Sequence, residues 1–246
     1  MSRADGRAQE ELRRITVIPD FIPTADGSVL IGCGNTRVLC TAMVEDKVPP
    51  FLTGTGKGWL TAEYAMLPAS TLTRKAREGR KGPDGRSVEI QRLIGRSLRA
   101  AFDLTKLGEH TITIDCDVIQ ADGGTRTASI TGGFIAAAMA VDKMMRDGRL
   151  TESPVVRGIN AISAGVVHGE VCVDLCYAED SRADADINVV MSTDGKLIEV
   201  QGTAEGAPFT RDELNRIIDL AVGANGKLTK IQKEALGEAW EQVIRE

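Results

Sequence analysis

Two acidic side chains in the second half of the chain have the chemistry of a divalent-metal site. Asp180 and Asp186 lie six positions apart across a short loop, a spacing that can bring both carboxylates together at the ends of adjoining strands. A carboxylate pair without a histidine suits Mg²⁺, a hard cation that takes one or two carboxylates and completes its shell with water and phosphate oxygens. Acidic turns are also common on acidic proteins, so a solvated turn is the alternative explanation for this pair.

A glycine loop in the first half has the chemistry of an anion site. Gly123 and Gly124 join an alternating apolar segment at 112–118, typical of a half-buried strand, to a compact apolar segment of helix length at 130–145. The glycines let consecutive N–H groups face an anion at the start of the helix, where the helix dipole also favours negative charge. Arg126 adds a planar fork suited to phosphate. The alternative is a tight turn whose arginine points into solvent.

A block of positive charge precedes both groups in the first half of the chain. The chain has a net charge of −5, yet the segment 74–99 holds nine arginines and lysines against three acids. Such a block suits a polyanion, and a nucleic acid is the obvious candidate. A solvated helix face beside a long exposed loop at 70–86 accounts for the same charges equally well.

Composition restricts the remaining classes of function. With 246 residues, 42% of them hydrophobic, the chain can bury a sizeable core. Its five cysteines are odd in number and form no Cys-x-x-Cys pair, which predicts buried reduced thiols and a cytoplasmic location. Two histidines leave little material for histidine acid–base chemistry. No apolar stretch reaches the ~20 residues of a membrane span, so no membrane association is expected.

The elements that must position these groups follow the periodicity of the sequence. In the first half we predict strands at 14–18, 28–31, 36–44, 60–67 and 111–119, and helices after the capping residue Ser87 and at 127–147. In the second half we predict strands at 155–167, 170–177, 186–191 and 196–201, and helices at 210–222 and 229–244. Strands followed by helices, twice over, predict an α+β fold with two pseudo-repeated strand-rich halves, about 1–150 and 151–246, in one domain spanning 1–246.

Taken together, five collinear motifs resemble the bacterial ribonuclease PH family, and no single motif carries the resemblance. They are Arg3-x-Asp5-Gly6-Arg7, the stretch from Gly85 to Arg96, the stretch from Asp117 to Ala128, Glu179-Asp180-Ser181 with Asp186-Ile187-Asn188, and Gln201-Gly202-Thr203-Ala204-Glu205. Ile187 stands where the family pattern leads us to expect methionine, and Asn188 stands where the related polynucleotide phosphorylases carry lysine. The second departure fits the smaller ribonuclease PH enzymes.

The resemblance implies a ribonuclease PH fold, of the kind also seen in the second domain of ribosomal protein S5, and a phosphate-dependent 3′ to 5′ exoribonuclease. Such a tRNA nucleotidyltransferase trims tRNA precursors and other single-stranded RNA 3′ ends, and it releases nucleoside diphosphates in a reversible reaction. Its ring is a homohexamer, a trimer of dimers. Inorganic phosphate is the co-substrate, and a divalent metal, Mg²⁺, is the cofactor.

Site residues carry over by position in this sequence. Arg86, Gly124, Thr125 and Arg126 match the phosphate site, and Asp180 and Asp186 match the catalytic pair that holds the metal. Five further arginines are predicted to guide RNA or to contact a neighbouring subunit: Arg74, Arg77, Arg80, Arg92 and Arg96. Two alternatives stay open at this point. A catalytically silent RNA-binding ring subunit usually lacks the acidic pair, and a metal-dependent RNA hydrolase needs neither Arg86 nor Arg126.

Overall fold

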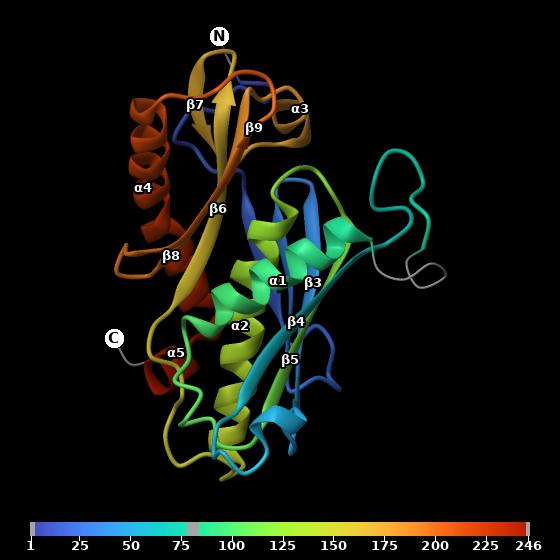
Figure 1. Ribbon diagram of the computed structural model, residues 1–246, viewed down its shortest axis with the longest axis vertical. Coiled ribbons are helices and arrows are strands. Elements are labelled where there is room, and N and C mark those ends of the chain that lie inside the picture. The colour runs from blue at the N-terminus through green and yellow to red at the C-terminus, as the bar shows by residue number, and fades with distance from the viewer. Residues whose placement is uncertain (1–2, 78–83, 245–246) are drawn as a thin grey trace.

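The computed structural model describes residues 3–77 and 84–244, which form two β-sheets with helices packed on and between them (Figure 1). The first sheet has the strand order β1-β2-β3-β5-β4, and only the β4–β5 pair in it is parallel. Its strands are β1 (Ile15–Pro19), β2 (Gly27–Cys33), β3 (Thr36–Glu45), β4 (Trp59–Met66) and β5 (Thr111–Gln120). A short 3-10 helix, η1 (Pro50–Leu52), precedes β4, and helix α1 (Gly85–Arg99) connects β4 to β5.

Helix α2 (Thr125–Arg146) lies at the centre of the molecule and joins its two halves. It packs against β2 and β3 of the first sheet, and also against β6 and α5 of the second half. Alanine, glycine and small polar residues let neighbouring elements approach it from several sides, and 16 of its 22 residues are buried. A helix that is apolar nearly all round is a core helix, and it fixes the position of whatever lies at its N-terminus.

The second sheet is antiparallel, with the order β7-β6-β8-β9. Its strands are β6 (Ile159–Val167), β7 (Glu170–Val173), β8 (Ala185–Ser192) and β9 (Leu197–Ala204). The helices of this half are α3 (Tyr177–Asp180), α4 (Arg211–Leu236) and α5 (Glu238–Val243). Helix α4 covers one face of the sheet, where Ile217, Ala221, Ala224 and Leu228 bury an apolar stripe (Figure 1). The α+β prediction is confirmed, with strands preceding helices in both halves.

Three details of the predicted elements are wrong. Helix α4 continues through Gly223 and Gly226, where we predict a break, because its buried stripe continues at helical spacing and outweighs the ~1 kcal/mol that each glycine costs. The predicted strand 170–177 ends at Val173, since Asp174 adopts a φ of 54° and turns the chain into α3. Asp84 caps α1 in place of Ser87 by accepting a hydrogen bond from the backbone N–H of Arg86.

All five cysteines are free thiols, and four of them are buried, as their apolar surroundings in the sequence predict. Cys33, the fifth, is half-buried as a residue, but its thiol group is desolvated, which raises the pKa of this thiol to about 12 and keeps it protonated at neutral pH. Across the described ranges, no helix combines the length and the apolar character that crossing a membrane requires. The description of residues 1–246 as one domain with a pseudo-repeat stays a prediction.

Candidate active site

A cavity of about 490 Å³ brings together the glycine loop, the carboxylate pair and the start of α1. All six residues predicted to bind phosphate or metal line it: Arg86, Gly124, Thr125, Arg126, Asp180 and Asp186. The first four come from the first half of the chain and the last two from the second half. The cavity therefore lies where the halves meet, beside the N-terminal end of the central helix α2.

The glycine loop needs both of its glycines. Gly123 and Gly124 have φ angles of 74° and 66°, in the left-handed region that residues with a Cβ rarely adopt. A Cβ on Gly123 would also lie 2.4 Å from the carbonyl oxygen of Leu175, so the loop packs directly against the segment that leads into α3. Gly124 then serves as the N-cap of α2. The strand, glycine loop and helix predicted from the sequence are confirmed.

The first residues of α2 are held in place by partners from distant segments. The hydroxyl groups of Thr125 and Tyr64 are 2.8 Å apart and hydrogen-bonded. Arg126 Nη1 donates to Gln201 Oε1 at 3.1 Å and lies 3.6 Å from Glu89 Oε1, while Gln201 Nε2 donates to the same glutamate oxygen at 2.8 Å. The guanidinium of Arg126 is therefore fixed by β9 and α1 together, as an anion-binding fork requires.

The two carboxylates sit in an electrostatically unfavourable place. Asp180 is the last residue of α3, which corrects the expectation that both acids end strands, and Asp186 lies in β8. Burial, followed by the negative charge of Asp180, raises the pKa of Asp186 to about 6. Burial also raises the pKa of Asp180, against the opposing effects of Arg86 and Arg126. Among the described residues, no hydrogen bond or ion pair joins either carboxylate to a partner.

This donor set fits a hard divalent cation. Two adjacent carboxylates in a polar cavity match Mg²⁺, which keeps several of its waters and takes few protein ligands. A binding cation would also relieve the repulsion that raises the pKa of Asp186. Within the ranges described, no three or more histidine, cysteine, aspartate or glutamate side chains gather as a metal cluster.

Described residues of the predicted basic block line two different cavities. Arg74 and Arg77 are exposed in the loop after β4, where the cavity lining includes Lys75, and Arg80 lies outside the described residues. Arg92 and Arg96 are exposed on α1 and line a separate groove of about 410 Å³, together with Trp59. Arg96 also pairs with Glu199 of β9, its Nε donating at 2.6 Å. That contact ties α1 to the second sheet.

Several lining residues have no predicted role. Tyr177 is 55% exposed at the start of α3, Leu72 is 97% exposed across the loop, and Asn188 is buried behind the carboxylate pair on β8. Tyr64 does not belong to this lining: it is buried against Thr125, and burial raises the pKa of its hydroxyl. Asn188 had a signal in the sequence as part of the motif Asp186-Ile187-Asn188. Tyr177 had one as an aromatic residue one helical turn before Asp180, but the predicted strand at 170–177 concealed it.

Models of known protein families match both halves of the chain that form this cavity. Residues 11–141 match the first domain of the 3′ exoribonuclease family, and residues 159–224 match its second domain. The chain belongs to the ribonuclease PH family. It is 57% identical to ribonuclease PH of Neisseria gonorrhoeae over 95% of this chain and 97% of that protein. Ribonuclease PH of Neisseria meningitidis serogroup C is 56% identical with the same coverage of both chains, 95% and 97%.

Solved structures share the fold of this family. A chain from the Archaeoglobus fulgidus exosome with RNA bound to the active site matches with a TM-score of 0.79 and 24% identity, over 93% of this chain and 92% of that one. Rice Rrp46 matches with a TM-score of 0.77 and 19% identity, over 95% and 100%. The predicted family, fold and enzyme class are confirmed: the chain is a phosphorolytic 3′ exoribonuclease that processes tRNA precursors. The roles of individual side chains stay predictions.

Proposed function

We propose that this chain performs the reaction of its family in the cavity between the two halves, by transferring the 3′-terminal nucleotide of an RNA to inorganic phosphate. The observation that carries the proposal is one cavity holding both a helix N-terminus with an arginine fork and a carboxylate pair with raised pKa values. Transfer of a nucleotidyl group requires both a fixed place for an attacking oxyanion and neutralisation of the charge that develops.

The phosphate dianion binds at the start of α2. Backbone N–H groups of the glycine loop face it with the positive end of the helix dipole, and the guanidinium groups of Arg126 and Arg86 neutralise its charge. Glu89 and Gln201 hold the Arg126 fork, so little reorganisation is needed when phosphate arrives. The nucleophile is thereby oriented toward the carboxylate side of the cavity, where the scissile phosphodiester lies.

Asp180 and Asp186 would hold Mg²⁺, which supplies charge neutralisation at the scissile phosphate. A phosphate oxygen forms a bond to the last internucleotide phosphorus, and the bond from that phosphorus to the 3′ oxygen of the penultimate nucleotide breaks. The 3′ oxygen takes up a proton and the terminal nucleotide leaves as a nucleoside diphosphate. Because a phosphodiester becomes a phosphoanhydride, much of the bond free energy is kept, and excess diphosphate drives the reaction backwards.

Tyr177 is suited to hold the terminal base. Its ring is exposed in the cavity and precedes Asp180 by one helical turn. A base stacked on an aromatic ring is stabilised by about 1–3 kcal/mol whatever its identity, which suits an enzyme that removes nucleotides in succession. Tyr177→Phe should therefore keep the Michaelis constant for RNA near that of wild type, while Tyr177→Ala raises it.

The assembly and the basic arginines belong to the same proposal. An exosome relative of the same fold supports a ring, here a homohexamer built as a trimer of dimers, and exposed Leu197 and Val200 on the edge strand β9 offer apolar surface for a neighbour. Arg74, Arg77 and Arg92 then either guide RNA or contact a second copy. The cytoplasmic location, which rests on the reduced cysteines, is part of the proposal as well.

The decisive experiment follows the products of single-stranded RNA incubated with Mg²⁺, with and without inorganic phosphate. We expect nucleoside diphosphates only when phosphate is present, and extension of the RNA when diphosphates are in excess. Nucleoside monophosphates formed without phosphate would indicate a hydrolase. RNA binding without any product would indicate a silent ring subunit. Either result overturns the proposal.

A further inference from the structure

A buried arginine that is not among the predicted site residues connects the glycine loop to the segment that precedes Asp180. Arg13 precedes β1 and is 7% exposed. Its guanidinium binds the carboxylate of Asp174, with Nε at 3.1 Å and Nη2 at 2.6 Å from Oδ1, and its backbone N–H donates to Oδ2 at 2.6 Å. Asp174 directly precedes the segment that leads into α3, and it adopts a φ of 54°. One side of Arg13 is thus anchored in the second half.

The other side of the same guanidinium contacts the glycine loop. Arg13 Nη1 donates to the carbonyl oxygen of Asp122, and Nη2 lies 3.5 Å from the carbonyl oxygen of Gly123. In a trans peptide the C=O and N–H groups point in opposite directions. Two carbonyl groups turned toward Arg13 therefore turn the following N–H groups, those of Gly123 and Gly124, away from it. This orientation is what an anion site on the opposite side of the loop needs.

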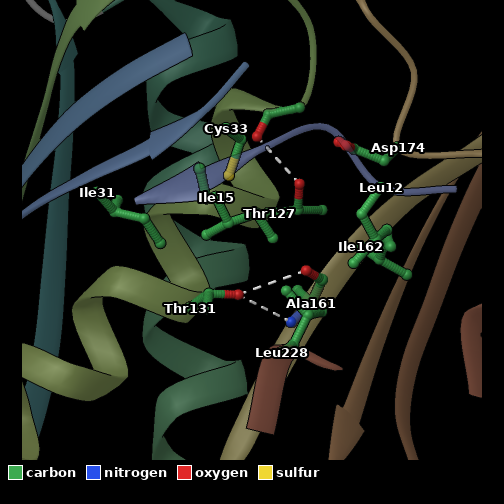
Figure 2. Close-up of a pocket in the computed structure, with 12 residues that line it drawn as sticks. Leu12, Ile15, Ile31, Cys33, Thr127, Thr131, Ala161, Ile162, Asp174 and Leu228 are labelled. Atoms are coloured by element: carbon green, nitrogen blue, oxygen red, sulfur yellow. Dashed lines mark hydrogen bonds between the residues drawn. The ribbon is translucent and has the colours of Figure 1, made fainter. Parts of the chain in front are cut away.

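Packing alone does not fix the underside of this loop. Beneath Gly124 lies a cavity of about 20 Å³, room for about one water. Figure 2 shows Thr127 pointing to the carbonyl of the loop above it and Thr131 bound to Ala161 of β6, with Asp174 and Leu12 beside them. Polar contacts therefore help to hold the loop at the start of α2. Thr127 Oγ1 donates to the carbonyl oxygen of Gly124 at 3.0 Å, and Thr36 Oγ1 donates to that of Gly123 at 2.7 Å, in addition to the contact of Arg13 Nη1 with Asp122.

A second contact completes the connection. Asp122 Oδ1 accepts a hydrogen bond from the backbone N–H of Tyr177 at 3.1 Å, at the start of the helix that ends in Asp180. Two sets of polar contacts therefore connect the glycine loop to the segment that carries Asp180. One set runs through Arg13 and Asp174, and the other is the hydrogen bond between Asp122 and Tyr177. A change in either set alters the position of the loop relative to α3.

We propose that Arg13 is a positioning residue, which holds the carbonyl groups of the glycine loop against Asp174 and so sets the place of the attacking phosphate relative to Asp180. This inference rests on the proposed function, because it concerns the anion bound at that loop. Lysine cannot replace Arg13, since a single ammonium cannot contact a carboxylate and two carbonyl groups in the geometry of a planar fork.

The test compares Arg13→Lys with Arg14→Lys in steady-state phosphorolysis. Arg14 is the exposed neighbour and serves as the matched control. For Arg13→Lys we expect the Michaelis constant for phosphate to rise about tenfold, equivalent to about 1.4 kcal/mol, while the constant for RNA changes less than about twofold. Arg14→Lys should leave both constants as in wild type. A purely structural role lowers the fraction of folded enzyme and the maximal rate, but leaves both constants unchanged.

Chemical rescue adds an independent readout. Arg13 lines an open cavity of about 570 Å³, so a guanidinium ion can reach its place in Arg13→Ala. Millimolar guanidinium should lower the Michaelis constant for phosphate of Arg13→Ala toward wild type and leave that of Arg14→Ala unchanged.

If Arg13→Lys does not fold, Asp174→Asn is tested instead, because it keeps the shape of the side chain and removes the charge that anchors Arg13. A phosphate constant that stays at the wild-type value overturns the inference. Wild-type enzyme without phosphate dependence overturns the proposed function instead.

Discussion

Two pairs of acids, all within thirteen residues of one another, have opposite surroundings. Asp174 and Glu179 are bound by arginines of the segment 3–13, which precedes β1, and the side chains of Glu179 and Arg3 are each 4% exposed. Asp180 and Asp186 are half-buried beside the same elements, but the charge of Asp180 opposes the ionisation of Asp186, and no described group hydrogen-bonds to either side chain. The first pair fixes the fold, and the second pair is left for a ligand.

The contrast lies in the partners, since burial opposes the ionisation of Glu179 just as it opposes that of Asp180 and Asp186. Burial opposes ionisation of Glu179, yet the hydrogen bonds and charge of Arg3 outweigh it and lower the pKa of Glu179 to about 2. Burial together with the charge of Asp180 raises the pKa of Asp186 to about 6. Adjacent carboxylates with opposite pKa shifts therefore divide into structural and functional groups, a division that one can test group by group.

The largest effect should come from the structural pair. Glu179→Gln leaves Arg3 buried without its counter-charge and weakens the cap on the backbone N–H of Cys176, which donates to Glu179 Oε2 at 3.1 Å. We expect the free energy of unfolding to fall by about 3–5 kcal/mol in denaturant titrations. The exposed Glu10→Gln should change it by less than about 0.5 kcal/mol. Equal stabilities for the two variants would remove the basis of the comparison.

The functional pair should behave in the opposite way. Asp180→Asn and Asp186→Asn should lower phosphorolysis by about 10²- to 10³-fold, because each removes a charge needed in the transition state. Their free energies of unfolding should equal or exceed that of wild type, since the repulsion between the two carboxylates disappears. Asp184→Asn, which lies between them in sequence, is the control for activity and stability. Near-normal turnover in either variant contradicts the assignment of the pair.

The pH dependence of stability should separate the two pairs within one titration. Glu179 has a lowered pKa, so its contribution is present above about pH 4.3 and is lost as the pH falls toward about 2. Asp186 has a raised pKa, so in buffer without divalent metal its ionisation lowers stability as the pH rises from about 4 to about 6. Each slope is at most about 1.4 kcal/mol per pH unit. Glu179→Gln should abolish only the first slope and Asp186→Asn only the second, in difference curves against wild type.

The sequence predicts these pairs unequally, for a physical reason. Asp180 and Asp186 are found by residue type and spacing, since a metal site is a local arrangement of carboxylates. The partners of Asp174 and Glu179 lie more than 160 residues earlier in the chain, at Arg3 and Arg13. Nothing in the periodicity of either segment connects them, although the motif Arg3-x-Asp5-Gly6-Arg7 contributes to the family resemblance. Its arginines contact the segment before Asp180.

The same limit explains the errors in the predicted elements. Strands with strict alternation, such as β3 and β5, lie close to their predicted positions, because one face is buried and the pattern is forced. The short helix α3 is not predicted, because the apolar residues that precede it extend the strand pattern up to Tyr177. The start of α3 is held by a hydrogen bond from Tyr177 N to Asp122, a tertiary contact that local pattern does not reveal. Local pattern therefore identifies the glycine loop and the carboxylates. The distance between the glycine loop and the carboxylates depends on contacts between the two halves.

The smallest predicted effect is on stability, and it tests whether a cation binds Asp180 and Asp186 and neutralises their charge. Mg²⁺ at about ten times its dissociation constant should raise the free energy of unfolding of wild type by about 1.4 kcal/mol, because it binds the folded state only. Glu179→Gln should keep this increment and Asp186→Asn should lose it, as followed by thermal denaturation with and without Mg²⁺. The cation should also remove the decline in wild-type stability between pH 4 and pH 6, since it stabilises the ionised form of Asp186. An equal increment in Asp186→Asn would mean that Mg²⁺ binds elsewhere, and the raised pKa of Asp186 would then not mark a cation site.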